Sequence, residues 1–223
     1  MANIDRALAS IIDHTLLKAT ATGADIDRLC QEARTYGFGA VCVNGCWVSR
    51  CRDRLRGTAV KVCCVVGFPL GAMAPGAKAG EAERAVADGA DEVDMVLNLG
   101  ALKSGDEALA ERDIRGVVAA AGGRPVKVIL ETGLLDEAEK VLACRLSQRA
   151  GAALVKTATG FAAGSAATAE DVALMRRTVG PALGVKASGG IRTRADAERM
   201  VASGATRLGT SSGIAIVTVA DGP

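Results

Sequence analysis

The chain has 223 residues, a formal net charge of +2, 49% hydrophobic residues and only one Trp, one Tyr and three Phe. Because it is nearly neutral, without runs of like charge and with few rings on which bases could stack, we expect no nucleic-acid partner. No apolar run reaches the roughly 18 residues of a membrane-spanning helix, so we expect no membrane partner either.

The N-terminal segment lacks the cationic start and the apolar run of a secretory signal, and the seven cysteines are an odd number. We therefore predict a reduced, cytoplasmic protein. Cys42, Cys46 and Cys51 do not have the paired C-x₂-C spacing of a zinc site, so no metal is predicted. The sequence stops at Pro223, and we expect no tail that could close over a site.

Eight short aliphatic and β-branched segments recur along the chain, at intervals of about 21 to 34 residues. This interval is the length of a strand followed by a crossover helix. The predicted strands lie near residue 12 and at 40–43, 60–66, 92–97, 126–130, 153–156, 184–187 and 206–209. Apolar residues spaced three and four apart predict helices between them, over Ala24–Tyr36, Ala77–Asp88, Glu107–Ala121, Asp136–Ala150, Ala169–Thr178 and Arg194–Ala202.

These eight strand–helix units, with no Pro/Ser-rich linker, predict an α/β fold in which residues 1–223 form a single-domain (β/α)₈ TIM barrel. The alternative is an open, doubly wound parallel sheet. That fold is typically marked by G-x-G-x-x-G after the first strand, a pattern that this sequence lacks.

Charged residues stand at the ends of otherwise apolar predicted strands. Lys156, Lys186 and Asp94 occur in ALVKTATG, LGVKASGG and EVDMVLNLG. Because an unpaired buried charge costs several kcal/mol, and because the strand ends of a barrel share one mouth, we expect these side chains to face one another there. They form either a structural network that fixes strand register or a catalytic site.

Two adjacent lysines favour amine chemistry. An isolated lysine has a pKa of about 10.4, and a neighbouring ammonium together with partial desolvation can lower that pKa by about three. One lysine then becomes a neutral amine able to form a Schiff base with a carbonyl substrate, while the other lysine and Asp94 carry protons. The residues alone leave open which lysine is the nucleophile. Lys61 and Lys127 stand earlier in their strands, and we expect structural or supporting roles for them.

Small residues follow the last predicted strands. Ser188–Arg192 follows the seventh strand and Gly209–Gly213 follows the eighth, with Thr159-Gly160 after the sixth. Glycine-rich loops after strands 7 and 8 that lead into helices present backbone N–H groups to a phosphate. The sequence therefore predicts a phosphorylated substrate.

The sequence resembles the deoxyribose-phosphate aldolase family of class I aldolases, nearly from end to end. The resemblance is carried by IDHTLLKAT (12–20), VGFPLGA (66–72), VKTATGF (155–161), GVKASGGIRT (184–193) and GATRLGTSSG (204–213), among other segments. It implies an aldehyde-lyase that reversibly cleaves 2-deoxy-D-ribose 5-phosphate to D-glyceraldehyde 3-phosphate and acetaldehyde, in deoxyribose-phosphate catabolism. It also implies no metal or other cofactor. Homodimers and homotetramers are common among barrels of this kind, and we expect one of these assemblies.

The resemblance also assigns roles to residues. Lys156 would form the Schiff base, Lys186 would be the second lysine that keeps it deprotonated, and Asp94 would be the proton-relay carboxylate. The substrate and its phosphate would contact Thr15, Cys42, Gly160, Gly189, Gly190, Gly209, Ser211 and Ser212. The sequence departs from the family pattern at Ala158, where serine is usual, at Gly45, where proline is common, and in the loop 161–168.

Two other hypotheses remain open. One is a different phosphate-binding barrel enzyme, such as a sugar-phosphate isomerase or a transaldolase-like enzyme, which shares the loops after strands 7 and 8 but does not require two strand-end lysines. The other is a catalytically silent barrel that binds a sugar phosphate, with the lysines and Asp94 in a structural network.

Overall fold

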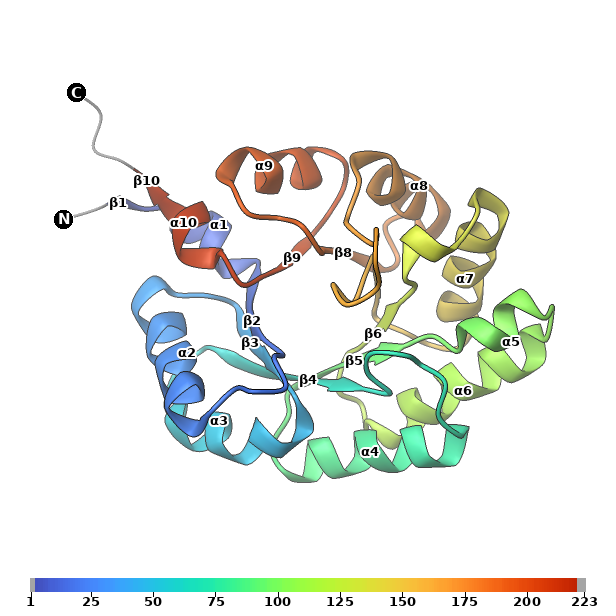
Figure 1. Cartoon of the computed structure of the whole chain (residues 1–223), viewed down its shortest axis with the longest axis horizontal. Coiled ribbons are helices and arrows are strands. Elements are labelled where there is room, and N and C mark those ends of the chain that lie inside the picture. The colour runs from blue at the N-terminus through green and yellow to red at the C-terminus, as the bar shows by residue number, and fades with distance from the viewer. Residues whose placement is uncertain (1–2, 220–223) are drawn as a thin grey trace.

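The structure of the protein, a computed structural model, describes residues 3–219. Eight parallel strands follow one another around a closed barrel, so the predicted TIM barrel is confirmed and the open sheet is excluded (Figure 1). β9 returns to pair with β2 and closes the ring. The strands are β2 (Ile12–Leu16), β3 (Ala40–Val43), β4 (Lys61–Val66), β5 (Glu92–Val96), β6 (Val126–Ile129), β7 (Leu154–Lys156), β8 (Gly184–Ser188) and β9 (Arg207–Thr210). The expectation about a C-terminal tail falls on residues 220–223, which lie outside the described part.

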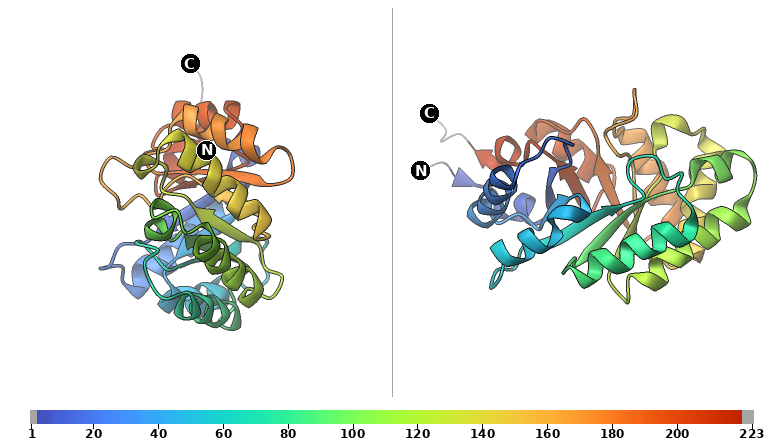
Figure 2. Two further views of the ribbon diagram at one scale, coloured as in Figure 1. Left: turned by 90° about the vertical axis from the view of Figure 1, so that its right-hand side faces the viewer. Right: turned by 60° about the horizontal axis from the view of Figure 1, so that its bottom comes forward.

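Helices surround the barrel, as the views in Figure 2 show from two sides. The six predicted helices are confirmed to within two residues as α2 (Gly23–Tyr36), α4 (Pro75–Ala87), α6 (Glu107–Ala120), α7 (Glu137–Arg149), α8 (Ala169–Val179) and α9 (Arg194–Ala202). Capping boxes fix the first residues of three helices. The side chains of Thr22, Asp136 and Thr193 each accept a hydrogen bond from the backbone N–H three residues later, and the side chain of that later residue accepts one from the backbone N–H of the capping residue. Across residues 3–219, no helix is both long enough and apolar enough to cross a bilayer.

Short elements complete the fold and were not predicted. They are β1 (Asn3–Ile4), α1 (Arg6–Ser10), η1 (Gly45–Trp47), α3 (Val48–Arg54), α5 (Leu99–Lys103), η2 (Thr132–Leu134), α10 (Gly213–Val217) and β10 (Thr218–Val219). Helices of five to seven residues make too few turns to show a period, and tertiary packing stabilises them. β1 and β10 pair antiparallel outside the barrel, which places Asn3–Ile4 beside Thr218–Val219 (Figure 1).

The two faces of each barrel strand differ in chemistry. In β5, Val93 and Met95 belong to the large apolar core between strands and helices, whereas Asp94 alternates with them and points to the barrel interior. In β6, Lys127 alternates in the same way with Val126 and Val128. The helix side of the barrel is therefore aliphatic, while its interior holds buried charges.

One buried ion pair lies outside the barrel interior. Lys78 in α4 and Asp113 in α6 are both fully buried, and the Lys78 ammonium donates to Asp113 Oδ2 at 2.5 Å. The same ammonium donates to the carbonyl oxygens of Gly71 at 2.9 Å and Val96 at 3.0 Å. The pair thus ties two helices to the loop after β4.

Asp113→Asn is expected to lower the free energy of unfolding by about 3–5 kcal/mol, because it leaves the Lys78 charge buried without its counterion. Urea unfolding followed by circular dichroism measures the loss. The matched control is Asp53→Asn, which breaks an exposed pair with Arg56 and should cost under about 1 kcal/mol. An equal, small cost in both variants would contradict the role assigned to the buried pair.

Candidate active site

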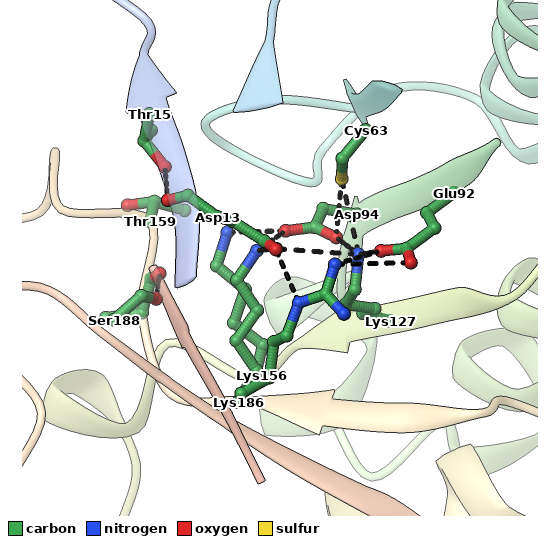
Figure 3. A network of polar contacts seen from close by, with 12 residues as sticks. Asp13, Thr15, Cys63, Glu92, Asp94, Lys127, Lys156, Thr159, Lys186 and Ser188 are labelled. Carbon is green, nitrogen blue, oxygen red and sulfur yellow. Dashed lines mark hydrogen bonds and ion pairs between the residues drawn. The ribbon is translucent and has the colours of Figure 1, made fainter. Parts of the chain in front are cut away.

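Asp94 lies at the centre of a buried network of charges inside the barrel (Figure 3). Its Oδ2 accepts hydrogen bonds from Lys156 Nζ at 2.8 Å and from Lys186 Nζ at 2.7 Å. Its Oδ1 accepts from Lys127 Nζ at 2.7 Å and from the Cys63 thiol at 3.1 Å. The structure therefore brings the three predicted catalytic side chains together, with both lysines bound to the carboxylate of Asp94.

The network continues toward the opposite end of the barrel, where β5 and β9 begin. Asp13 accepts from both Lys186 and Arg207. Lys127 Nζ also lies 2.6 Å from Glu92 Oε2, and Arg207 Nη2 lies 3.2 Å from the same oxygen. The network thus holds four basic side chains against three carboxylates, an excess of one positive charge when every group is ionised.

The charges set the protonation of the buried groups. Burial alone would raise the pKa of Asp94, but the surrounding Lys127, Lys156 and Lys186 outweigh it and hold that pKa well below the usual range. Burial would likewise lower the pKa of Lys186, and the attraction of Asp13 and Asp94 raises it instead. Lys186 is therefore an ammonium ion beside Lys156 in the ligand-free protein.

A cavity of about 280 Å³ opens above this network at the carboxyl ends of the strands. Lys156 reaches it, whereas Lys186 is fully buried below and does not line it. The sequence alone does not distinguish the two lysines; in the structure, Lys156 is the one of the two that lines the cavity. Of the residues predicted to contact the substrate, those lining the cavity are Thr15, Gly160, Gly189, Gly190, Gly209, Ser211 and Ser212.

Backbone geometry explains the glycine loop after β8. Gly189 has a φ of +93°, and a Cβ there would lie 3.1 Å from the carbonyl oxygen of Ser165. Only glycine fits this conformation and this close approach without strain. The loop after β8 can therefore approach the loop after β7 closely at one end of the cavity.

Two cations of the cavity wall were missed as site residues. Lys18 and Arg192 both line the cavity, and no acidic side chain of residues 3–219 does. Lys18 lies in IDHTLLKAT and Arg192 lies in GVKASGGIRT, but the sequence does not show that these side chains reach the cavity wall, because their positions there depend on how the loops fold. Together with Lys156, they make the cavity suited to an anionic ligand.

Cys42 is fully buried inside the barrel and packs with Leu17, Cys63 and Val65 beneath the cavity. The ligand atoms of Cys42, Cys63 and Asp94 lie within 4.8 Å of one another, close enough for a metal ion. However, burial raises the pKa of Cys63 well above its ordinary value, and the ammonium groups on Asp94 repel a cation. This group of side chains is therefore poorly suited to metal binding.

The departures from the family pattern lie close to the site. Ala158 is fully buried, and its carbonyl oxygen accepts a hydrogen bond from Ser188 Oγ at 2.6 Å. This bond joins the segment after β7 to the end of β8. Gly45 is the first residue of η1, at the end of β3.

Comparison with known proteins gives concordant results. The sequence profile described as DeoC/LacD family aldolase matches residues 7–218. The chain is 59% identical over 215 residues to a deoxyribose-phosphate aldolase of Geobacillus sp. (strain WCH70), covering 96% of each chain. It is 58% identical over 210 residues to a deoxyribose-phosphate aldolase of Streptococcus gordonii, covering 94% of this chain and 95% of that one. Among solved structures, the tetrameric deoxyribose phosphate aldolase from Aeropyrum pernix superposes with a TM-score of 0.88 at 37% identity, over 95% of this chain and 89% of that one.

Proposed function

The chain belongs to the DeoC/LacD family of aldolases, and we propose that it reversibly cleaves 2-deoxy-D-ribose 5-phosphate to D-glyceraldehyde 3-phosphate and acetaldehyde. The proposal treats the whole chain as one catalytic domain. The observation that carries it is the amine of Lys156 at the cavity, 2.8 Å from an Asp94 oxygen that also binds the Lys186 ammonium at 2.7 Å.

Charge balance supports Lys156 as the nucleophile. With every group ionised, the buried network has one positive charge in excess, and loss of one proton from Lys156 leaves it neutral. Lys186 keeps its proton because two carboxylates hold it, whereas Lys156 has Asp94 as its ion-pair partner among the described residues. A neutral amine facing the cavity can attack an aldehyde.

The reaction then follows in balanced steps. The Lys156 amine attacks the C1 aldehyde of the open-chain sugar, and loss of water gives an iminium ion. Removal of the proton from the C3 hydroxyl breaks the C2–C3 bond, releases glyceraldehyde 3-phosphate and leaves an enamine on Lys156. Protonation of C2 and hydrolysis then release acetaldehyde and restore the amine. Lys186 and Asp94 accept and return these protons.

The phosphate end of the substrate would lie against the glycine and serine loops. Gly189 and Gly190 follow β8, while Ser211 and Ser212 follow β9 and lead into α10. Lys18 and Arg192 supply positive charge on the same cavity wall, which supports a phosphorylated rather than a neutral sugar.

Incubation with acetaldehyde and sodium borohydride is expected to add one ethyl group to Lys156, because borohydride reduces the iminium ion irreversibly. Intact mass and peptide mapping locate the adduct. Lys156→Ala should lose it, while Lys61→Ala, which removes an exposed lysine of β4, should keep it. An adduct on Lys186 would reverse the roles of the two lysines. No adduct on either would favour an isomerase-type or silent barrel.

We also propose that the protein assembles as a homodimer or homotetramer in the cytoplasm. The tetrameric relative from Aeropyrum pernix supports self-association. The seven cysteines are all free, and all except Cys46 are buried, which supports a reducing compartment.

A further inference from the structure

Glu131 combines two costly features immediately after β6. Its side chain is buried, with 2% of the residue exposed, and within residues 3–219 its carboxylate is not part of any ion pair. Its φ is +56°, the only positive value of a non-glycine residue in the described chain. A buried carboxylate without a cation and a left-handed glutamate each cost free energy, and they persist only where the surroundings enforce them.

Two backbone hydrogen bonds flank Glu131 and join this part of the chain to the end of β7. The N–H of Leu130 donates to the carbonyl of Lys156 at 2.9 Å, and the N–H of Thr132 donates to the carbonyl of Thr157 at 3.0 Å. Glu131 therefore lies between two hydrogen bonds to the segment that carries the proposed nucleophile. The left-handed turn between them accompanies a side chain that reaches across to the loop after β7.

The carboxylate binds both ends of a short segment of that loop. Oε1 accepts from the backbone N–H of Thr159 at 3.2 Å and from the hydroxyl of Ser165. Oε2 accepts from the hydroxyl of Thr159. Gly160 and Phe161, which both line the cavity, lie between these two anchored residues. The segment is part of the orange loop between β7 and α8, which lies over the barrel in Figure 1 and projects from it in Figure 2.

The anchored segment in turn contacts the proposed phosphate loop. The Ser165 carbonyl oxygen lies 3.1 Å from the position of a Cβ on Gly189, and the N–H of Ala167 donates to the Gly189 carbonyl at 3.0 Å. Glu131 thus links the loop after β6 to the loops after β7 and β8. Displacement of the segment would alter the wall formed by Gly160 and Gly189 more than the buried amine network.

We propose that Glu131 is a positioning residue that holds the Thr159–Ser165 segment in place for the phosphate end of the substrate. This inference rests on the proposed function for its substrate. It differs from the proposed chemistry, because Glu131 acts through Thr159 and Ser165 and does not line the cavity itself.

Three variants of Glu131 separate its carboxylate from its backbone. Glu131→Ala removes the carboxylate and keeps the strained φ, whereas Glu131→Gly removes it and relieves the strain. Glu131→Gln keeps an acceptor for Thr159 and offers its amide hydrogens to the Ser165 oxygen. The measured quantity is the ratio of kcat/KM for 2-deoxyribose 5-phosphate to kcat/KM for unphosphorylated 2-deoxyribose.

This ratio is expected to fall roughly tenfold in Glu131→Gly and Glu131→Ala, mainly through a higher KM for the phosphorylated sugar. Glu131→Gln should stay within about threefold of the unmodified protein. Ser165→Ala, which leaves the left-handed residue intact, should show a smaller fall in the same direction. Glu170→Ala, an exposed carboxylate in the first turn of α8, is the matched control and should leave the ratio unchanged.

An equal fall of kcat/KM for both sugars would mean general destabilisation and would overturn the proposal, as would an unchanged ratio. Titration calorimetry with inorganic phosphate provides a second readout that needs no turnover. The dissociation constant of phosphate should rise roughly tenfold in Glu131→Gly. If the unmodified protein binds phosphate but does not cleave the sugar, the proposed function fails and the calorimetric comparison still decides the role of Glu131.

Discussion

Lys186→Leu is expected to lower kcat for 2-deoxyribose 5-phosphate cleavage by on the order of 10²–10⁴-fold at neutral pH, while the protein remains folded. Lys186 is fully buried and does not line the cavity, so we expect the loss to arise through the charge network and not through contact with the substrate. Two consequences of removing its ammonium account for the expected loss.

The first consequence is electrostatic. Without Lys186 the network holds three basic side chains against three carboxylates, so it is balanced only when Lys156 keeps its proton. Lys156 then serves as a counterion of Asp94 and is a poor nucleophile. The second consequence is the loss of a proton donor next to Asp94 Oδ2. The same balance explains why the variant folds, because Asp13 keeps Arg207 and Asp94 keeps Lys127.

Steady-state rates between pH 6 and pH 10.5 test this account. The variant should regain activity as the pH rises, because a higher pH favours the neutral, nucleophilic form of an amine. Lys103→Leu, which breaks a surface pair with Glu139, is the matched control and should behave like the unmodified protein. Near-full turnover of Lys186→Leu at pH 7 would refute the role of Lys186.

The barrel could be predicted from the sequence because its determinants are local and repeated. Each strand contains aliphatic residues, and helix starts such as Thr193 with Asp196 carry their own capping signal. Short elements such as α5 lack a period. Their positions follow from packing and from single contacts, such as the Asn98 side chain that accepts the N–H of Ala101.

The site could be predicted in part for a similar reason. A lysine or aspartate inside an apolar strand is conspicuous, so Lys156, Lys186 and Asp94 could be singled out in advance. Which of the two lysines lines the cavity could not be predicted, because that depends on how far each side chain lies below the open end of the barrel. The role of Glu131 could not be predicted from the sequence, because its left-handed backbone and its hydrogen bonds to Thr159 exist only in the folded chain.

Asp94→Asn is the second variant with a large expected effect. Asp94 Oδ2 receives hydrogen bonds from both lysines of the site, so it can pass a proton between Lys186 and the enamine on Lys156. The amide keeps the shape of the carboxylate but cannot accept and return that proton. We expect proton transfer at C2 to fall by on the order of 10²–10⁴-fold.

Two measurements separate this step from formation of the Schiff base. Exchange of the methyl protons of acetaldehyde for deuterium, followed by NMR in D₂O, reports the enamine step, while borohydride trapping reports the iminium ion. In Asp94→Asn, exchange should nearly cease while trapping on Lys156 persists, because a neutral Lys156 needs no counterion. Lys127 keeps Glu92 and Lys186 keeps Asp13, so the variant should stay folded.

Asp53→Asn makes the same chemical change at an exposed position and should leave both exchange and trapping unchanged. If exchange continued at the normal rate in Asp94→Asn, Asp94 would not carry the proton. If trapping were lost together with exchange, the carboxylate would be needed to hold the amine of Lys156 in place. Because exchange and trapping are measured on the same substrate, their ratio assigns Asp94 to proton transfer or to amine positioning without reference to overall turnover.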